Sequence, residues 1–394
     1  MNKLTYISLF SCAGVGCYGF KAEDFECVAT NEYLGKRLAI QKYNKKCKYD
    51  TGYIEGDIES AEVQSKIDIE VQRWKDNEGM DDLTLLVATP PCQGMSIANY
   101  FKKEKDIERN SLVVTAIEQV LKYKPRYFVF ENVPAFLKTA CVDKDGNVKA
   151  IGDLITEKLG KIYEIERGVM DFGNYGANSS RKRTLVTGVR KDIYKGKGIM
   201  PENVGSKTMR EIIGHLPSLK VMGEIDSTDI YHNYRTMPEN VLKWVKATPE
   251  GCSALDNANP EDRPHRIVDG KYSPYSATVK SKYRRNIWDR VAYCILTRSD
   301  IASSQNTLHP SDDRVLSIRE LMLLMSIPTT FKWTEQSEKE LNTLTFEGKK
   351  AYLKKNEMNI RQCIGEAVPT GVFMNIARQI KHNEEIKYDS RGNV

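Results

Sequence analysis

The sequence lacks the patterns by which cysteine usually holds a metal ion or a disulfide framework. Its nine cysteines are an odd number, scattered without a C-x-x-C pair or a cysteine–histidine cluster of ligand spacing. Such usage is typical of a reducing compartment and argues against a zinc site. We therefore expect no disulfide framework and no bound metal.

Long apolar runs and internal repeats are also missing. No stretch approaches the roughly 18–20 apolar residues that a membrane helix needs, and no apolar segment with a cleavage site follows Met1. The mean hydropathy is −0.50, as in an ordinary globular protein. These absences predict a cytoplasmic protein with no membrane partner.

The chain has a mild excess of positive charge. The net charge is +6 over 394 residues, and the isoelectric point is near 8.6. This suits a polyanionic partner such as nucleic acid, but it is also common among proteins that never touch one. The length favours one large domain with a smaller one.

Short strand-like and helix-like segments alternate in the first 190 residues. This alternation predicts an α/β fold, a doubly wound and mainly parallel sheet with helices on both faces. Its chemistry is then expected at the carboxyl edges of the strands. The expected strands are Thr5–Phe10, Phe25–Thr30, Tyr53–Ile58, Leu83–Ala88, Tyr127–Glu131, Ile162–Met170 and Thr184–Val189.

The pattern changes after Arg190. Residues 191–310 are rich in Pro, Asn, Asp and Tyr and read as a separate, loop-rich module. Helical segments return at Arg314–Met325, at about 335–356 and at Phe373–Lys381. The polar tail 383–394 is expected to be disordered.

A glycine-rich segment follows the first expected strand. Gly14-x-Gly16-x-x-Gly19 matches the dinucleotide-binding pattern, and Glu32 lies near the end of the next strand, where it could accept ribose hydroxyls. Asp57 after the third strand could accept the adenine amino group, and Tyr33 could stack on the ring. The residues alone leave three alternatives: an NAD or FAD site, an S-adenosylmethionine site, or a turn that only packs a helix on the sheet.

Two further segments follow the fourth and fifth expected strands. Pro90-Pro91-Cys92-Gln93 follows one, and Glu131-Asn132-Val133 ends the other. Neighbouring strand ends of a doubly wound sheet face one cleft, which would bring a thiol and a carboxyl together. A buried structural thiol is the common alternative for a lone cysteine, but the Pro-Pro lead-in and the carboxyl partner favour a site.

Six segments together give the chain a family resemblance. It resembles the DNA (cytosine-5)-methyltransferases of the bacterial restriction–modification type, over a region from near residue 5 to near residue 380. The segments stand in the family's order and spacing, which makes the combination specific. They are Leu9–Gly14, Pro91–Gln93, Glu131–Val133, Arg181–Arg183, Arg314–Glu320 and Gly365–Pro369.

The resemblance implies a catalytic mechanism. C5 of cytosine is too poor a nucleophile to accept a methyl group directly, and thiolate attack on C6 makes C5 enamine-like. Cys92 would be this nucleophile, and Glu131 would hold or protonate N3. Arg183, with Arg181, would contact the base at O2 or brace the nucleophile loop. The attacked cytosine must leave the base stack.

The resemblance also implies the fold type, the domains and the ligands. The fold would be the Rossmann-like type of S-adenosylmethionine-dependent methyltransferases. Residues 1–190 would form the catalytic and cofactor-binding domain, 191–310 a target-recognition domain, and 311–382 a part returning to the catalytic domain. The residues expected to bind the cofactor, S-adenosyl-L-methionine, are Phe10, Gly14, Glu32, Tyr33, Asp57, Ile58, Pro90, Ala367 and Val368.

Double-stranded DNA is the expected partner. Within Lys271–Arg290, basic residues alternate with tyrosines, a pattern that suits phosphate contacts but also fits one basic edge of a small domain. The expected DNA contacts are Gln93, Ser96, Lys280, Lys282, Arg284 and Arg285. Nothing argues against a monomer, and a cognate restriction endonuclease would be encoded separately.

Three rival functions remain at this stage. An RNA (tRNA) cytosine-5 methyltransferase would share the motifs but have a shorter insert than residues 191–310. A catalytically silent DNA-binding protein would not need Cys92, and an NAD-dependent oxidoreductase would leave the Pro-Pro-Cys-Gln segment unexplained. Glu366 departs from the family, whose last motif usually has Asn there, and a carboxylate cannot donate the hydrogen bonds of an amide.

Overall fold

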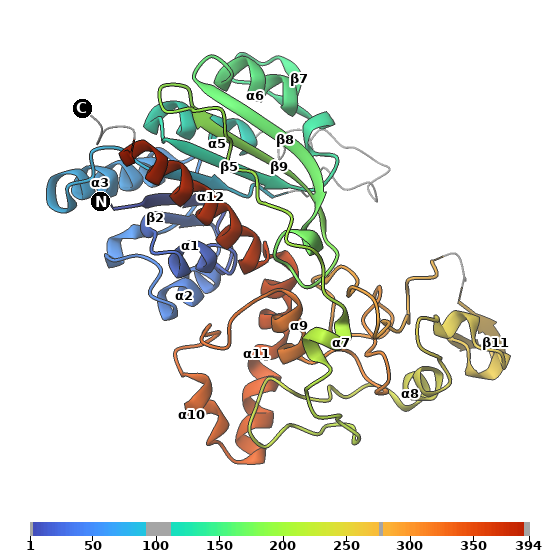
Figure 1. Cartoon of the computed structure of the whole chain (residues 1–394). Coiled ribbons are helices and arrows are strands. Elements are labelled where there is room, and N and C mark those ends of the chain that lie inside the picture. Colours follow the sequence, from blue (N-terminus) through green and yellow to red (C-terminus); the bar gives the residue numbers. More distant parts are fainter. Residues whose placement is uncertain (1–2, 92–111, 276–278, 390–394) are drawn as a thin grey trace. The chain divides into compact units, whose positions relative to one another are not determined.

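The computed structural model describes residues 3–91, 112–275 and 279–389 (Figure 1). The chain divides by its internal contacts into two compact units, which are described separately. The first comprises Met1–Tyr175, Lys182–Asn203 and Thr370–Val394, and the second comprises Gly176–Arg181 and Val204–Pro369.

The first unit is built on a seven-stranded sheet in the order β3-β2-β1-β4-β5-β9-β8. Strands β1 to β5 pair in parallel, and β9 runs antiparallel to both of its neighbours. The predicted α/β fold with a mainly parallel sheet is confirmed. The strands are β1 Thr5–Leu9, β2 Glu26–Glu32, β3 Tyr53–Glu55, β4 Leu85–Ala88, β5 Tyr127–Asn132, β8 Tyr163–Asp171 and β9 Lys182–Arg190.

Helices cover both faces of this sheet because its strands are apolar on both sides. On β1, Ile7 and Leu9 join the core formed with α3, α5 and α6. Tyr6 points to the other face, where its ring lies 5.3 Å from Phe20 of α1, which in turn stacks on Phe373 of α12 at 5.0 Å. The helices of this unit are α1 Tyr18–Ala22, α2 Gly35–Tyr43, α3 Ala61–Glu78, α5 Leu112–Tyr123, α6 Ile151–Leu159 and α12 Thr370–Asp389.

The periodicity of the sequence did not predict some of the short elements of this unit. Helix α6 and the hairpin of β6 (Ala140–Val142) with β7 (Val148–Ala150) were not expected. The ends of helix α3 follow local rules. The Ser60 hydroxyl caps it by accepting the Val63 amide, and Gly79 ends it at φ +65°.

The C-terminal helix corrects the expected disordered tail. Helix α12 continues to Asp389, six residues beyond Asn383, where the tail was expected to begin. The reason is a buried polar anchor. The carboxylate of Glu384 accepts hydrogen bonds from Arg126 at 2.7 Å and from the Tyr127 hydroxyl at 2.9 Å. Residues 390–394 lie outside the described part of the chain.

The second unit has little regular structure, as expected for residues 191–310, but its boundary differs from the expected one. Residues 311–369 group with this unit and not with the catalytic domain, since α11 contacts α9 and α9 contacts α7. Its elements are α7 Met209–Ile213, α8 Glu239–Lys246, β10 His265–Val268, β11 Lys271–Pro274, α9 Ile318–Leu324, α10 Glu338–Asn342 and α11 Phe346–Glu366.

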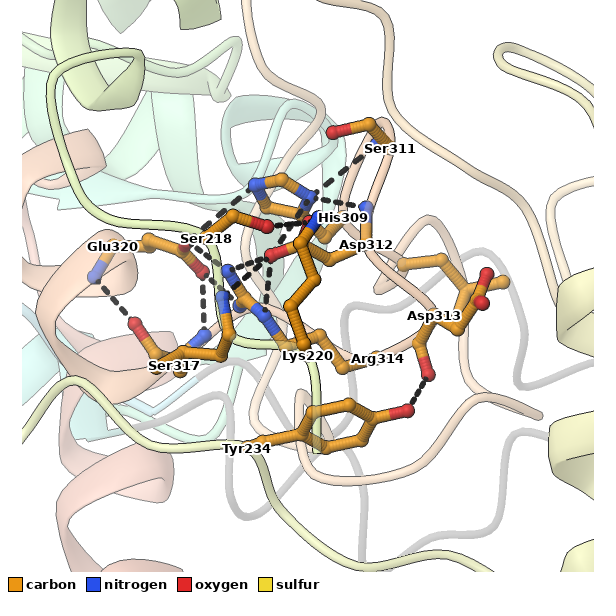
Figure 2. A network of polar contacts seen from close by, with 12 residues as sticks. Ser218, Lys220, Tyr234, His309, Ser311, Asp312, Asp313, Arg314, Ser317 and Glu320 are labelled. Carbon is orange, nitrogen blue, oxygen red and sulfur yellow. Dashed lines mark hydrogen bonds and ion pairs between the residues drawn. The ribbon is translucent and has the colours of Figure 1, made fainter. Parts of the chain in front are cut away.

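A buried network of charged side chains organises the second unit (Figure 2). The Arg314 guanidinium donates to both oxygens of Glu320, at 2.8 and 2.7 Å, and its Nε donates to Asp312 at 3.1 Å. Glu320 also accepts the Ser317 amide, which completes the capping box of α9. His309 accepts the Asp312 amide through Nδ1, at 2.8 Å. Buried charges are tolerated here because each has several partners.

The described residues offer neither a membrane-spanning helix nor a cluster of metal ligands. No described helix is both long and apolar enough to cross a membrane. Within residues 3–91, 112–275 and 279–389, no group of three or more His, Cys, Asp or Glu side chains could hold a metal ion.

Candidate active site

The parallel strands of the first unit bring the expected site residues to one edge of the sheet. The strand order β3-β2-β1-β4-β5 sets the carboxyl ends of these strands in a row. Along this row lie Asp57 after β3, Glu32 at the end of β2, Phe10 after β1, Pro90 after β4 and Glu131 near the end of β5. Residues far apart in the sequence therefore share one edge, where ligands bind in sheets of this kind.

The glycine-rich loop after β1 turns sharply, because three of its residues take left-handed backbone conformations. These are Phe10 at φ +55°, Cys12 at +46° and Gly14 at +74°. A side chain at Gly14 would be strained by this φ, and its Cβ would also lie 3.0 Å from Cγ of Gln41. The loop thus presents backbone at the edge where a cofactor would approach.

Glu32 ties this loop to the end of β2. One carboxylate oxygen accepts the Cys12 amide at 2.7 Å, and the other accepts the Leu34 amide at 3.1 Å. A carboxylate offers about four acceptor positions, so two remain for ribose hydroxyls. This fits the role expected of Glu32 in holding a nucleoside.

The residues expected around an adenine differ in exposure. Tyr33 is 70% exposed, which suits the stacking role expected of it. Asp57 is exposed, while Ile58 is buried. Asn31 holds the two strand ends together, because its side-chain amide donates to the carbonyls of Ile54 and Gly56 at 3.2 and 3.0 Å. An exposed aromatic ring beside an acid and a glycine loop fits the adenosine part of S-adenosyl-L-methionine.

The third glycine of the loop pattern serves helix packing. A Cβ on Gly19 would lie 2.4 Å from the Thr370 carbonyl oxygen and 2.6 Å from the Met374 nitrogen, so α1 and α12 need this glycine to meet. The Thr370 hydroxyl donates to the Val15 carbonyl at 3.0 Å. The C-terminal helix is thereby attached to the glycine loop, and Ala367 and Val368 directly precede it in the chain.

An acid and a base meet at the end of β5. Glu131 pairs across the sheet with Leu185 of β9, and Arg183 lies two residues further along on the same face. Their side chains form an ion pair, with 3.3 Å between Arg183 Nε and a Glu131 carboxylate oxygen. Both groups are largely buried. The structure thus brings together two of the residues expected to act on the base.

The segment that leads to Cys92 is fixed to the same strand end. The Asn132 side-chain amide donates to the Pro90 carbonyl at 2.9 Å, while its own oxygen accepts the Val133 amide at 2.8 Å. The Thr89 hydroxyl donates to the Phe10 carbonyl at 2.9 Å, which joins this segment to the glycine loop. Cys92, Gln93 and Ser96 lie outside the described residues.

Arg181 and Arg183 have different surroundings despite their closeness in sequence. Arg181 belongs to the second unit and is 4% exposed. Its guanidinium donates to the carbonyls of Ile295 and Gly365, at 3.2 and 3.1 Å. Arg183 thus pairs with Glu131, whereas Arg181 donates to backbone carbonyls of the second unit.

The basic residues expected to contact DNA separate into exposed and buried ones. Lys280 and Lys282 are exposed, and Arg284 is half-buried with its guanidinium over the Tyr293 ring at 5.0 Å. Arg285 corrects the expectation, because it is 3% exposed and donates to the backbone carbonyls of four residues. These acceptors are Val245, Thr248, His309 and Asp312.

Sequence reasoning missed residues that support the site without facing a ligand. Asn132 follows Glu131 directly, but the sequence predicted no role for its side chain. Gln41 and Lys46 lie under the glycine loop, at the end of α2 and just after it, and are buried. Spacing could have placed Gln41 on the buried side of a helix, but nothing in the sequence pairs it with Lys46. Glu366 is the last residue of α11, and its side chain is exposed.

Comparison with known proteins shows the family of this chain. The C-5 cytosine-specific DNA methylase family matches residues 4–382. The Type II methyltransferase M1.HgaI of Avibacterium volantium is 30% identical over 390 residues, which cover 95% of this chain and 97% of the relative. The Type II methyltransferase M.XorII of Xanthomonas oryzae is 23% identical over 356 residues, covering 84% and 78%.

A solved structure has the same fold over almost the whole chain. It is described as a DNA modification methyltransferase encoded within an E. coli prophage, and it matches with a TM-score of 0.60 at 15% identity. The match covers 97% of this chain and 100% of that one. The chain belongs to the C-5 cytosine-specific DNA methylase family and is a DNA (cytosine-5)-methyltransferase whose cofactor is S-adenosyl-L-methionine.

Proposed function

We propose that this chain methylates one cytosine within a specific site of duplex DNA, through a covalent bond between the Cys92 sulfur and C6 of the base. The observation that carries the proposal is the Glu131–Arg183 ion pair beside the Pro90–Pro91 segment. Because Cys92 follows Pro91 directly, a thiol and a carboxyl would approach the same cytosine.

The chain's own residues would act on the base in a definite order. The Cys92 thiolate adds to C6, and the electron pair displaced from the ring is stabilised at N3 by Glu131. Arg183 keeps the Glu131 carboxyl oriented. S-adenosyl-L-methionine supplies the methyl group for C5. Loss of the C5 hydrogen as a proton then breaks the C6–sulfur bond and returns the thiolate.

The cofactor would be held by the residues at the β1, β2 and β3 ends. Backbone at Gly14 and Phe10 would accommodate the donor, and Glu32 would accept its ribose hydroxyls. Tyr33 would stack on the adenine, with Asp57 and Ile58 beside it. Pro90, Ala367 and Val368 complete the proposed contact set.

Duplex DNA would be positioned by the basic surface residues and by the nucleophile segment. Lys280, Lys282 and Arg284 would contact phosphates, while Gln93 and Ser96 would lie against the extruded base and its neighbours. Arg285 is left out of this set, since its donors are used inside the unit.

Restriction–modification is the proposed biological setting. Both relatives above carry the name Type II methyltransferase, and their lengths are largely covered by this chain. A cognate endonuclease for the same DNA site would then be encoded separately. DNA modified by this enzyme would resist that endonuclease.

Bisulfite sequencing of a plasmid treated with the enzyme tests the proposal. We expect 5-methylcytosine at one position of one recurring sequence, and none with the Cys92→Ala variant. Transfer of labelled methyl groups to tRNA but not to duplex DNA would contradict it. Methylation scattered over unrelated sequences would contradict the site specificity alone.

A further inference from the structure

A buried polar cluster lies against the glycine loop. It consists of Ser11, Thr30, Gln41 and Lys46, whose exposed fractions are 9%, 0%, 1% and 9%. Lys46 is unusual among them, because a lysine is seldom buried unless its ammonium is paired. Nothing in the proposed chemistry uses this cluster.

The ammonium of Lys46 fixes the orientation of the Gln41 amide. It donates to the Gln41 side-chain oxygen at 2.9 Å and to the Thr30 hydroxyl at 2.8 Å. An ammonium can only donate, so the amide oxygen of Gln41 must face Lys46. The amide nitrogen then faces the loop, where it donates to the Ser11 hydroxyl at 2.7 Å and to the Cys12 carbonyl at 2.6 Å.

The peptide groups of Cys12 are therefore held from two sides. Its carbonyl is bound to Gln41, and its amide is bound to the Glu32 carboxylate at 2.7 Å. Cys12 and Phe10 have positive φ values, which non-glycine residues adopt only when their surroundings impose them. Gly14 also rests on the Gln41 side chain, as the 3.0 Å approach of an added Cβ shows.

We infer that Gln41 and Lys46 are positioning residues that hold the glycine loop, and through it the Glu32 carboxylate, in the shape that binds S-adenosyl-L-methionine. This rests on the proposed cofactor contacts of Gly14 and Glu32. A loop already in its binding shape loses less conformational entropy when the ligand arrives, so affinity depends on the cluster. Lys46 thus orients the Gln41 amide, Gln41 holds the glycine loop, and the loop binds the cofactor.

Two substitutions test the chain of contacts. Gln41→Glu keeps the size and the acceptor that faces Lys46, but it removes both N–H donors and turns an oxygen toward the Cys12 carbonyl. Lys46→Met keeps the length and removes the ammonium donor to the Gln41 oxygen, which leaves the Thr30 hydroxyl, at 2.8 Å, to donate to that oxygen. Lys42→Met is the matched control. Lys42 follows Gln41 on α2, and its exposed side chain lies over the Tyr53 ring, outside the cluster.

The KM and Kd for S-adenosyl-L-methionine should rise about ten-fold in Gln41→Glu, which corresponds to about 1.4 kcal/mol. A rise of about five-fold is expected in Lys46→Met. At saturating cofactor, kcat should stay within about two-fold of the wild type, and the Kd for DNA should not change. Lys42→Met should match the wild type in every measurement.

The competing outcome is a cluster that supports only the fold. In that case the melting temperature and the active fraction would fall in both variants, while the KM for the cofactor would stay within about two-fold of the wild type; that result overturns the inference. A wild type that binds no S-adenosyl-L-methionine would instead contradict the cofactor site, and the two failures are distinguished by titrating the wild type first.

Discussion

In the first unit, the site residues stand at the ends of hydrogen-bonded strands whose apolar side chains form a continuous core. In the second unit, by contrast, backbone segments without regular structure are held by buried arginines. Arg285, Arg314 and Arg361 are each no more than 3% exposed, and each donates to backbone carbonyls. The same residue type that would bind a phosphate on the surface thus builds the interior here. Burial, and not basic character, decides which role an arginine has.

Replacing Arg285, which is buried, and Lys280, which is exposed, tests whether burial decides the role of a basic residue in the second unit. Replacing Arg285 with Met removes a donor from four carbonyl groups, of which those of Val245 and Asp312 keep a backbone amide donor, so the free energy of unfolding of the second unit should fall by about 3–5 kcal/mol. Lys280→Met is the control and should leave the urea midpoint unchanged. Urea denaturation followed by tryptophan fluorescence measures both. A midpoint for Arg285→Met equal to that of the wild type would show that the buried guanidinium does not hold the unit.

The buried network should also make the second unit sensitive to acid. Burial lowers the pKa of His309 to about 4 from 6.5, against the opposing effect of the Glu320 carboxylate. Between these values the unfolded chain binds a proton that the folded unit does not, so stability falls as the pH decreases from 6.5 to 4. The loss should reach about 3 kcal/mol. Trp288, whose ring lies 5.1 Å from that of His309, provides a local fluorescence signal.

His309→Asn is the matched variant for this pH range. Its side-chain oxygen can accept the Asp312 amide in place of Nδ1, but it does not titrate. Stability of this variant should be flat between pH 6.5 and about 5. Asp312 and Glu320, whose pKa values are lowered from 3.8 and 4.5, begin to lose their contribution as the pH approaches those unfolded values. The same slope in both proteins would rule out His309 as its source.

In the first unit, the largest loss of methylation rate is expected when Glu131 is replaced. Glu131→Gln preserves shape but cannot supply a proton or a full charge at N3, so the single-turnover methylation rate should fall about 100-fold. DNA affinity should change little, because the group acts on the reacting base. A variant with a normal rate and weakened DNA binding would assign Glu131 to binding alone.

The smallest effect is expected for the exposed lysines of the second unit. If Lys282 contacts a phosphate, Lys282→Ala should weaken DNA binding equally for all sequences, by about 1 kcal/mol or less. The dependence of log K on log salt should become shallower by about 0.9. An unchanged salt slope would mean that Lys282 does not contact the DNA backbone.

The sequence predicted the first unit better than the second, for a physical reason. Strands such as Tyr127–Glu131 are short apolar runs, and parallel pairing puts their ends together once the strand order is known. The position of Glu131 in the site could thus be predicted from its place after a strand. The Lys46–Gln41 contact and the burial of Arg285 depend on side chains brought together by tertiary folding, which no local period encodes. The helix at 383–389 was missed because its anchor, Arg126, is distant in sequence.

Covalent trapping on duplex DNA containing 5-fluorocytosine tests whether the Cys92 sulfur forms a bond to C6 of the base. Fluorine at C5 cannot leave as a proton does, so a Cys92 adduct at C6 should persist after methyl transfer. With S-adenosyl-L-methionine present, the wild type should give a denaturation-resistant protein–DNA complex, and Cys92→Ala should give none. Equal trapping by both proteins, or methylation without any trapped complex in the wild type, would contradict the account.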